Sequence, residues 1–253
     1  MNPHKLTRHG AALLTLHRLS FLTFQVFVFV IVGSLSAKIS FPKTPGGGRL
    51  AVVVDERLAA LRRTPDLSSR LVRRLGRGRM VAIRGSRTVG DGVVFYLVNV
   101  TSRTHGWIQR EAVVSAARAG DDERLLDLIK ASEGFDRIVR ARIFLDNFMR
   151  SPLRPQVLLL LSDAAEEQAA KLSRDAVQRL RDVPEGPSTF SYFLNYTGLD
   201  RYNRQRVTFT FDRTIKRFHY DGAALRELLR RYPNSPEATI ARKRLAQLAQ
   251  LKN

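Results

Sequence analysis

The sequence predicts an α+β fold, in which a small β-domain is followed by a helical region that contains a short β-hairpin. Short apolar runs separated by turn residues fill residues 49–115. Beyond Ser115 the apolar residues recur at helical spacing. Val207, Phe209 and Phe211 alternate with threonines, a pattern that indicates one strand of the hairpin. We therefore expect two modest units, because domains typically span about 100–200 residues.

The amino terminus has the order of charges and apolar residues of a secretory signal. Three basic residues precede the apolar run 21–35, and the small residues Ser36 and Ala37 follow it. A helix over that run would span roughly 22 Å, which is shorter than the ~30 Å hydrocarbon core of a bilayer. We predict that residues 1–37 are a signal peptide, with an uncleaved signal anchor as the alternative. Residues 38–48, rich in Pro and Gly, are expected to form a flexible linker.

Charge and composition limit the classes of function. The chain has 43 basic and 23 acidic residues and a formal net charge of +20. This excess attracts phosphates, anionic lipids and acidic polymers. It is spread along the chain, so solvated helix faces and an anionic-polymer site are both open explanations. The chain has no cysteine, which excludes disulfides, thiolate nucleophiles and cysteine-ligated zinc.

The expected strands of the first domain are four short runs rich in β-branched and aromatic residues. They are residues 51–54, 80–83, 93–100 and 106–109. Glycines at 85, 90, 92 and 106 supply the turns between them. A β-domain of this size is marginal in isolation, so we expect it to pack against the helices that follow.

Three segments of this region resemble a bacterial SH3 (SH3b) domain. They are Leu61-Arg62-x-x-Pro65, then Phe95-Tyr96-x-Val98, and finally Gly106-Trp107-Ile108. The resemblance covers residues 49–115 and implies a small SH3-like β-barrel. It also implies an aromatic groove, for which Arg62, Tyr96 and Trp107 are the candidate residues. Packing in the barrel core is the alternative role for the two aromatic side chains.

An internal repeat organises the helical region. Residues 150–157 read RSPLRPQV and residues 231–238 read RYPNSPEA, and each stretch lies between two helical segments. This helix, Pro-x-x-Pro turn and helix resembles the tetratricopeptide (TPR) repeats of bacterial envelope proteins. We expect a first TPR-like pair within residues 120–182 and a second at residues 222–251. Helix caps are expected at Asp121-Asp122 and Ser235.

The segment between the two pairs, residues 183–221, is rich in aromatic residues. Five of the six tyrosines of the chain lie within residues 192–232. Aromatic residues beside arginines are enriched at binding hot spots, although packing between the helical pairs is the alternative. The candidate partner-binding residues here are Tyr192, Tyr196, Tyr202, Arg217 and Tyr220.

Patterns typical of catalysis are missing from the sequence. It contains no HExxH, GxSxG or phosphate-binding loop, and His105 and His219 are far apart. We therefore expect no catalytic, metal-binding or cofactor-binding residues. Paired carboxylates in a cleft could still support hydrolase activity, and an enzyme is our third hypothesis for the function.

The sequence thus favours an exported, non-enzymatic binding or scaffolding protein of the bacterial cell envelope. In this reading the SH3-like domain binds a wall peptide or protein segment, and the TPR-like helices bind a protein partner. The alternative is an auxiliary targeting module of a wall-degrading or polyanion-binding system, held mainly by its basic charge. Nucleic acid is not expected as a partner of an exported protein, and membrane contact is expected only through an uncleaved anchor.

Overall fold

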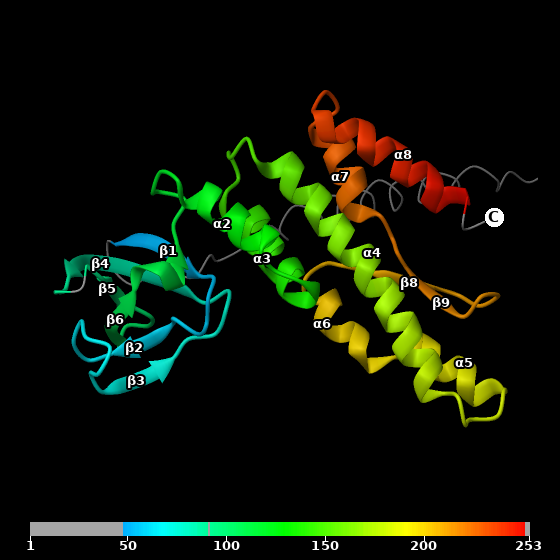
Figure 1. The fold of residues 1–253 in the computed structure, drawn as a ribbon, viewed down its shortest axis with the longest axis horizontal. Helices are drawn as coiled ribbons and strands as arrows, with labels where there is room; N and C mark the ends of the chain where they lie inside the picture. The colour runs from blue at the N-terminus through cyan, green and yellow to red at the C-terminus, as the bar shows by residue number, and fades with distance from the viewer. Residues whose placement is uncertain (1–47, 91, 251–253) are drawn as a thin grey trace, which may run out of the picture. The chain divides into compact units, whose positions relative to one another are not determined.

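A computed structural model describes residues 48–90 and 92–250 of the chain (Figure 1). The predicted signal segment 1–37 and most of the predicted linker lie outside the described residues. All described residues belong to one unit, residues 44–253. Within this part of the chain, no helix is long and apolar enough to cross a membrane. The fold is α+β, as the sequence predicts.

The β-domain is a seven-stranded antiparallel sheet. Its strands are β1 (Arg49–Val53), β2 (Ala60–Arg62), β3 (Leu71–Arg74), β4 (Met80–Thr88), β5 (Val94–Asn99), β6 (His105–Gln109) and β7 (Val113–Val114). Their spatial order is β3-β2-β6-β5-β4-β1-β7. The end strands β3 and β7 do not pair with each other, so the described strands form an open sheet and no closed barrel is found. All four predicted strands are present.

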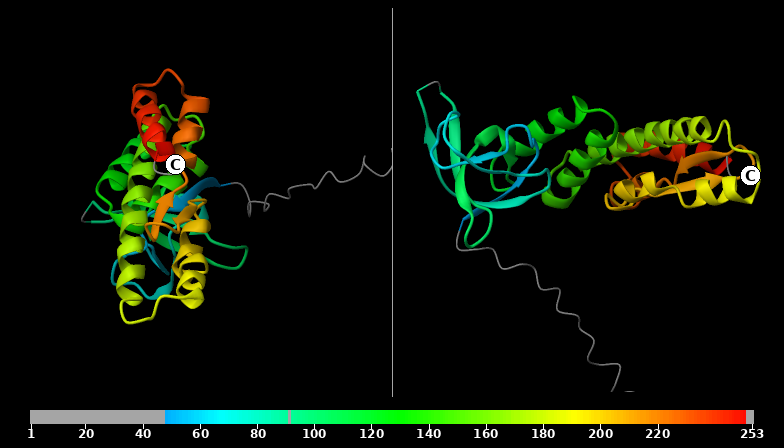
Figure 2. Two further views of the ribbon diagram at one scale, coloured as in Figure 1. Left: turned by 90° about the vertical axis from the view of Figure 1, so that its right-hand side faces the viewer. Right: turned by 90° about the horizontal axis from the view of Figure 1, so that it is seen from below.

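Seven helices and a hairpin follow the sheet. The α-helices are α2 (Asp121–Lys130), α3 (Gly134–Asn147), α4 (Arg154–Arg179), α5 (Pro187–Leu194), α6 (Asp200–Asn203), α7 (Ala223–Arg231) and α8 (Pro236–Gln250). The 3-10 helices are η1 (Arg110–Ala112) and η2 (Thr197–Leu199). The hairpin consists of β8 (Phe209–Asp212) and β9 (Arg217–Tyr220). Figure 2 shows the hairpin beside the long helix α4, against which β9 packs.

The two helix pairs of the repeat pack as neighbours. Helix α3 packs on α4, α7 packs on α8, and α4 also packs on α7. The buried Arg154, the first residue of α4, links the two Pro-x-x-Pro turns. Its guanidinium donates to the carbonyl oxygen of Leu145 at 2.7 Å and to the hydroxyl oxygen of Tyr232 at 2.9 Å. In the first copy of the repeat, this buried arginine therefore takes the place of a capping side chain.

The two predicted helix caps are wrong. The residue before α2 is Gly120, in a left-handed conformation, and no side chain caps that helix. The buried Asp121 instead accepts a hydrogen bond from the main-chain N–H of Ser115 at 2.8 Å, which ties the end of the sheet to α2. At the start of α8, the hydroxyl of Ser235 is buried without a hydrogen-bond partner. The turn is closed by the main chain, where the Ala238 N–H donates to the Ser235 carbonyl at 3.0 Å.

The sheet packs against the helices, as its small size predicts. Successive side chains of a strand point to opposite faces. Ala51 and Val53 therefore join the core of the sheet, whereas Val52 and Val54 join the core formed with the helices. Strand β1 thus contributes to two hydrophobic cores at once.

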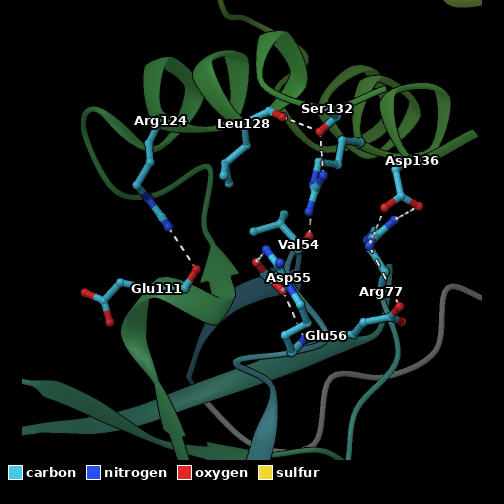
Figure 3. Close-up of polar contacts among 11 residues, drawn as sticks. Val54, Asp55, Glu56, Arg77, Glu111, Arg124, Leu128, Ser132 and Asp136 are labelled. Atoms are coloured by element: carbon cyan, nitrogen blue, oxygen red, sulfur yellow. Dashed lines mark hydrogen bonds and ion pairs between the residues drawn. The ribbon is translucent and has the colours of Figure 1, made fainter. Parts of the chain in front are cut away.

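Arginines complete the junction between the sheet and helices α2 and α3 (Figure 3). Arg124 of α2 donates to the Glu111 carbonyl oxygen at 3.1 Å. The guanidinium of Arg77 lies 2.6 Å from the carboxylate of Asp136, near the start of α3. Charge-assisted bonds of this kind are stronger than neutral ones.

Candidate binding surfaces

The first candidate surface is a row of side chains across the outer face of the sheet, the sheet-face row. It contains Leu71, Arg62, Trp107 and Leu97. Arg62 pairs with Leu71 on one side and with Trp107 on the other, and Trp107 pairs with Leu97. Directly paired residues of antiparallel strands share one face. Their neighbours Leu61 and Ile108 are fully buried on the opposite face.

The sheet-face row is partly open to solvent. Leu71 is 44% exposed, and the other three side chains are half-buried. The Arg62 guanidinium donates to the main-chain oxygen of Ser69 at 2.6 Å and so holds the loop of residues 63–70 near the row. The structure therefore brings together two predicted site residues, Arg62 and Trp107.

Tyr96 is separate from this row. Its ring is 9% exposed and belongs to the core of the sheet, and its hydroxyl accepts a hydrogen bond from Arg118 at 2.8 Å. Its neighbours in β5 have opposite orientations, so Leu97 faces the row while Tyr96 faces inward. Core packing is thus the role that the structure gives to Tyr96.

Glycine at position 106 has a local reason. A Cβ atom there would lie 2.6 Å from the Arg62 carbonyl oxygen and 2.9 Å from Cγ of Leu61. Strand β2 therefore approaches β6 too closely for any side chain at this position. The Gly-Trp pair seen in the sequence thus combines a residue that allows the close approach of β2 with the aromatic residue of the row.

Most of the predicted aromatic cluster lies inside the protein. Tyr196, Tyr202 and Tyr220 are buried, and the Tyr202 hydroxyl donates to the side-chain oxygen of Gln168 at 3.0 Å. Burial raises the pKa of both Tyr202 and Tyr220. These three tyrosines join the hairpin to the helices, whereas Tyr192 is half-buried.

The second candidate surface is a groove between α4, β9 and the end of α8, the α4–β9 groove. Its volume is ≈ 760 Å³. Cationic side chains line it at Arg174, Arg181, Lys216 and Arg217. Apolar side chains line it at Ala169, Ala170, Val177, Ile215, Phe218 and Leu248. Of the predicted residues, Arg217 and Tyr220 belong to it.

The charges of the α4–β9 groove are strongly unbalanced. Glu166 provides the only carboxyl among its lining residues, and burial raises the pKa of this group. Lys216 contacts Glu185 outside the groove. Arg174, Arg181 and Arg217 form no ion pair with any residue that the structure describes. The groove is therefore cationic with apolar patches.

The sequence contains one signal for this groove. Arg174 and Val177 are three residues apart in α4, which places them along one helix face, and Arg181 follows just beyond the end of the helix. An exposed apolar residue that is flanked in the sequence by two arginines is a pattern typical of a contact surface. Ile215 also lines the groove, but it lies in the hairpin turn, so helical spacing in the sequence cannot assign it to this surface.

Neither surface has the composition of a metal centre. Across residues 48–90 and 92–250, no group of three or more His, Asp or Glu side chains is placed to hold a metal ion.

The comparisons give no relative: no protein-family model, curated protein or solved structure matches the chain.

Proposed function

We propose that the protein is a non-enzymatic binding or scaffolding protein of the bacterial cell envelope. The SH3-like sheet would bind an extended wall peptide or protein segment, and the TPR-like helix pairs would bind a protein partner. The observation that carries this proposal is the sheet-face row, where Arg62 and Trp107 are paired in register beside exposed Leu71. Export rests on the sequence of residues 1–37.

The sheet-face row suits an extended segment for two reasons. Neighbouring strands are about 4.8 Å apart, so four side chains on four strands cover roughly 14 Å. Trp and Arg supply large contact areas and directional hydrogen bonds, and they dominate binding hot spots. Beside the row, β3 is an end strand of the sheet, so its outer backbone groups can accept an added strand.

The helix pairs support the second half of the proposal. Helices α3 and α4 pack together, as do α7 and α8, and α4 contacts α7 in the manner of consecutive helical repeats. The hairpin and α5 occupy the space beside α4. This arrangement leaves one side of α4 open as the α4–β9 groove.

Capture of envelope components tests the proposal. Tagged full-length protein would be recovered from bacterial cells and assayed for bound envelope proteins and for binding to purified sacculi. Trp107→Ala should weaken capture about tenfold or more, as expected for a hot spot. A second variant of the row is Leu71→Asp. Its matched control is Val72→Asp, because Val72 is 43% exposed in the same strand as Leu71 but outside the row.

The two substitutions on β3 give the sharper comparison. Leu71→Asp should abolish capture, since it places a charge in the row, and Val72→Asp should leave it unchanged. Equal capture by wild-type protein and Trp107→Ala would exclude the sheet face as the binding surface.

A second candidate function rests on the net charge of +20. An auxiliary targeting module held by charge would bind anionic envelope polymers and release them steeply as salt rises, because screening weakens exposed charges. Binding to sacculi at about 50 mM and about 300 mM NaCl separates the two functions. Loss of binding only at the higher salt favours the targeting module, whereas a flat response removes it.

A further inference from the structure

We infer that the α4–β9 groove is a binding site for an extended peptide segment that carries both carboxylates and apolar side chains. This inference deepens the proposed function, because it names the class of partner that the helical region takes. It does not depend on the sheet-face row.

The charge of the groove selects an acidic ligand. Arg174 lies in α4, Arg181 lies two residues beyond the end of that helix, and Arg217 lines the same groove from β9. Guanidinium groups match carboxylates in geometry and bind them with two parallel hydrogen bonds. Three guanidinium groups along one groove, none of them ion-paired with a described residue, therefore favour a ligand with several carboxylates.

The apolar lining distinguishes a peptide from a simple polyanion. Val177, which lies between Arg174 and Arg181 in the sequence, is 51% exposed, and Ile215 is 48% exposed on the hairpin. A polymer of charges alone would leave both side chains in water. A peptide with apolar residues between its acidic ones would cover them and gain the corresponding hydrophobic free energy.

A buried polar atom in the groove also lacks a partner. The Nε2 atom of His219 is buried, and no described residue forms a hydrogen bond with it. Buried polar atoms are nearly always paired, so an orphan atom in a lined groove calls for a ligand. His219 lies two residues after Arg217 in β9, so the two side chains share one face of the hairpin. Both residues belong to the lining of the groove.

The ligand must be recognised through side chains. The main-chain N–H of Phe218 donates to the hydroxyl of Ser173 at 2.8 Å, and that hydroxyl lies 3.4 Å from the Phe218 carbonyl oxygen. Ser173 is itself buried in α4. The free edge of β9 is therefore already satisfied at its centre, which excludes strand addition there and leaves the arginines and His219 as the recognition groups.

Fluorescence anisotropy with the full chain tests the site. The probe is a short fluorescein-labelled peptide in which Glu alternates with Leu, and the comparison peptide has Gln in place of Glu. The double variant Arg174→Glu/Arg217→Glu should weaken probe binding about tenfold or more. Arg213→Glu provides the matched control for a single reversal at Arg217, because Arg213 is exposed in the same hairpin but outside the groove.

His219 is tested by a conservative pair of variants. His219→Leu should weaken probe binding about fivefold or more, whereas His219→Gln should retain most of it, because the amide keeps a donor near the position of Nε2. Circular dichroism of each variant confirms that the helices are intact.

Specific results would overturn the inference. They are equal binding of the Glu and Gln peptides, equal loss in Arg213→Glu and Arg217→Glu, or binding of polyglutamate as tight as that of the probe, which would assign the groove to a polyanion. Trp107→Ala should bind the probe normally. If Trp107→Ala loses envelope capture but still binds the probe, the sheet-face row and the groove are separate binding surfaces.

Discussion

Arg140, buried in α3, donates a hydrogen bond from Nε to the main-chain carbonyl oxygen of Val54, 3.3 Å away. Val54 follows directly after strand β1, so this bond joins the sheet to the helical core (Figure 3). The same guanidinium contacts the hydroxyl of Ser132 at the turn between α2 and α3. Burial lowers the pKa of Arg140, because desolvation disfavours the charged form. One side chain therefore fixes three chain segments at the cost of a buried charge.

Replacing Arg140 with leucine should destabilise the fold. The change leaves the Val54 carbonyl and the Ser132 hydroxyl without their donor, and an unsatisfied buried group costs about 1–3 kcal/mol. Urea unfolding should show the corresponding fall in the free energy of unfolding. Arg150→Leu is the control, because Arg150 is exposed, and such surface changes usually stay within about 0.5 kcal/mol. Equal stability of both variants would show that the Arg140 contacts contribute nothing.

Acid should loosen the same junction. A hydrogen bond from Arg77 lowers the pKa of Asp136, and hydrogen bonds from Arg57 lower that of the buried Asp55. A carboxyl whose pKa is lower in the folded state stabilises the protein above the ordinary value of about 3.9. That contribution is lost as the pH falls through the lower folded pKa. The urea midpoint should therefore decrease below about pH 4.

Asp136→Asn tests the origin of this acid response. Asparagine cannot ionise, so the variant should be less stable than the wild type near neutral pH. Its urea midpoint should also change less between about pH 6 and about pH 3. An unchanged pH dependence in the variant would exclude the Arg77–Asp136 pair as a source of the acid sensitivity.

The sequence predicts the long elements of this fold well because their patterns are strong. The repeat at residues 150–157 and 231–238 locates both helix pairs, and the return strand of the hairpin has the predicted bounds, Arg217–Tyr220. Strands β2 and β3 have only three and four residues and contain arginines, so no alternation reveals them. The pairing of β2 also depends on distant residues of β6, and local pattern cannot supply it.

The candidate surfaces were predicted only in part for a related reason. Arg62 and Trp107 could be chosen by residue type, but their neighbour Leu71 becomes a neighbour only through sheet register. Tyr202 and Tyr220 were chosen because aromatic residues gather near arginines, and the same composition fills a core. Residue type alone does not distinguish an aromatic side chain that binds a partner from one that packs inside.

The close approach of β2 and β6 predicts opposite outcomes for two glycines. Gly106→Ala would push a Cβ atom against the backbone of β2 and should cost about 1–3 kcal/mol, the usual range for overpacking. Gly85→Ala, in β4 of the same sheet, adds a Cβ with nothing within 4 Å and should be neutral or slightly stabilising. Thermal unfolding of the two variants measures the difference. A Gly106→Ala protein as stable as the wild type would contradict the close packing of these strands.

The hydroxyl of Tyr220 should stabilise the start of α7. Its oxygen accepts a hydrogen bond from the main-chain N–H of Ala224 at 2.7 Å, in the first turn of α7, where the Asp221 carboxylate accepts the N–H of Ala223 at 3.0 Å. Tyr220→Phe leaves that buried N–H unpaired and should cost about 1–2 kcal/mol. Tyr196→Phe is the control, since the Tyr196 hydroxyl has no hydrogen-bonding role within the described chain.

Because burial keeps Tyr220 protonated well above its ordinary pKa, its ionisation in an alkaline absorbance titration should coincide with unfolding. Ionisation of every tyrosine before unfolding would show that the hydroxyl of Tyr220 is open to water and does not hold α7.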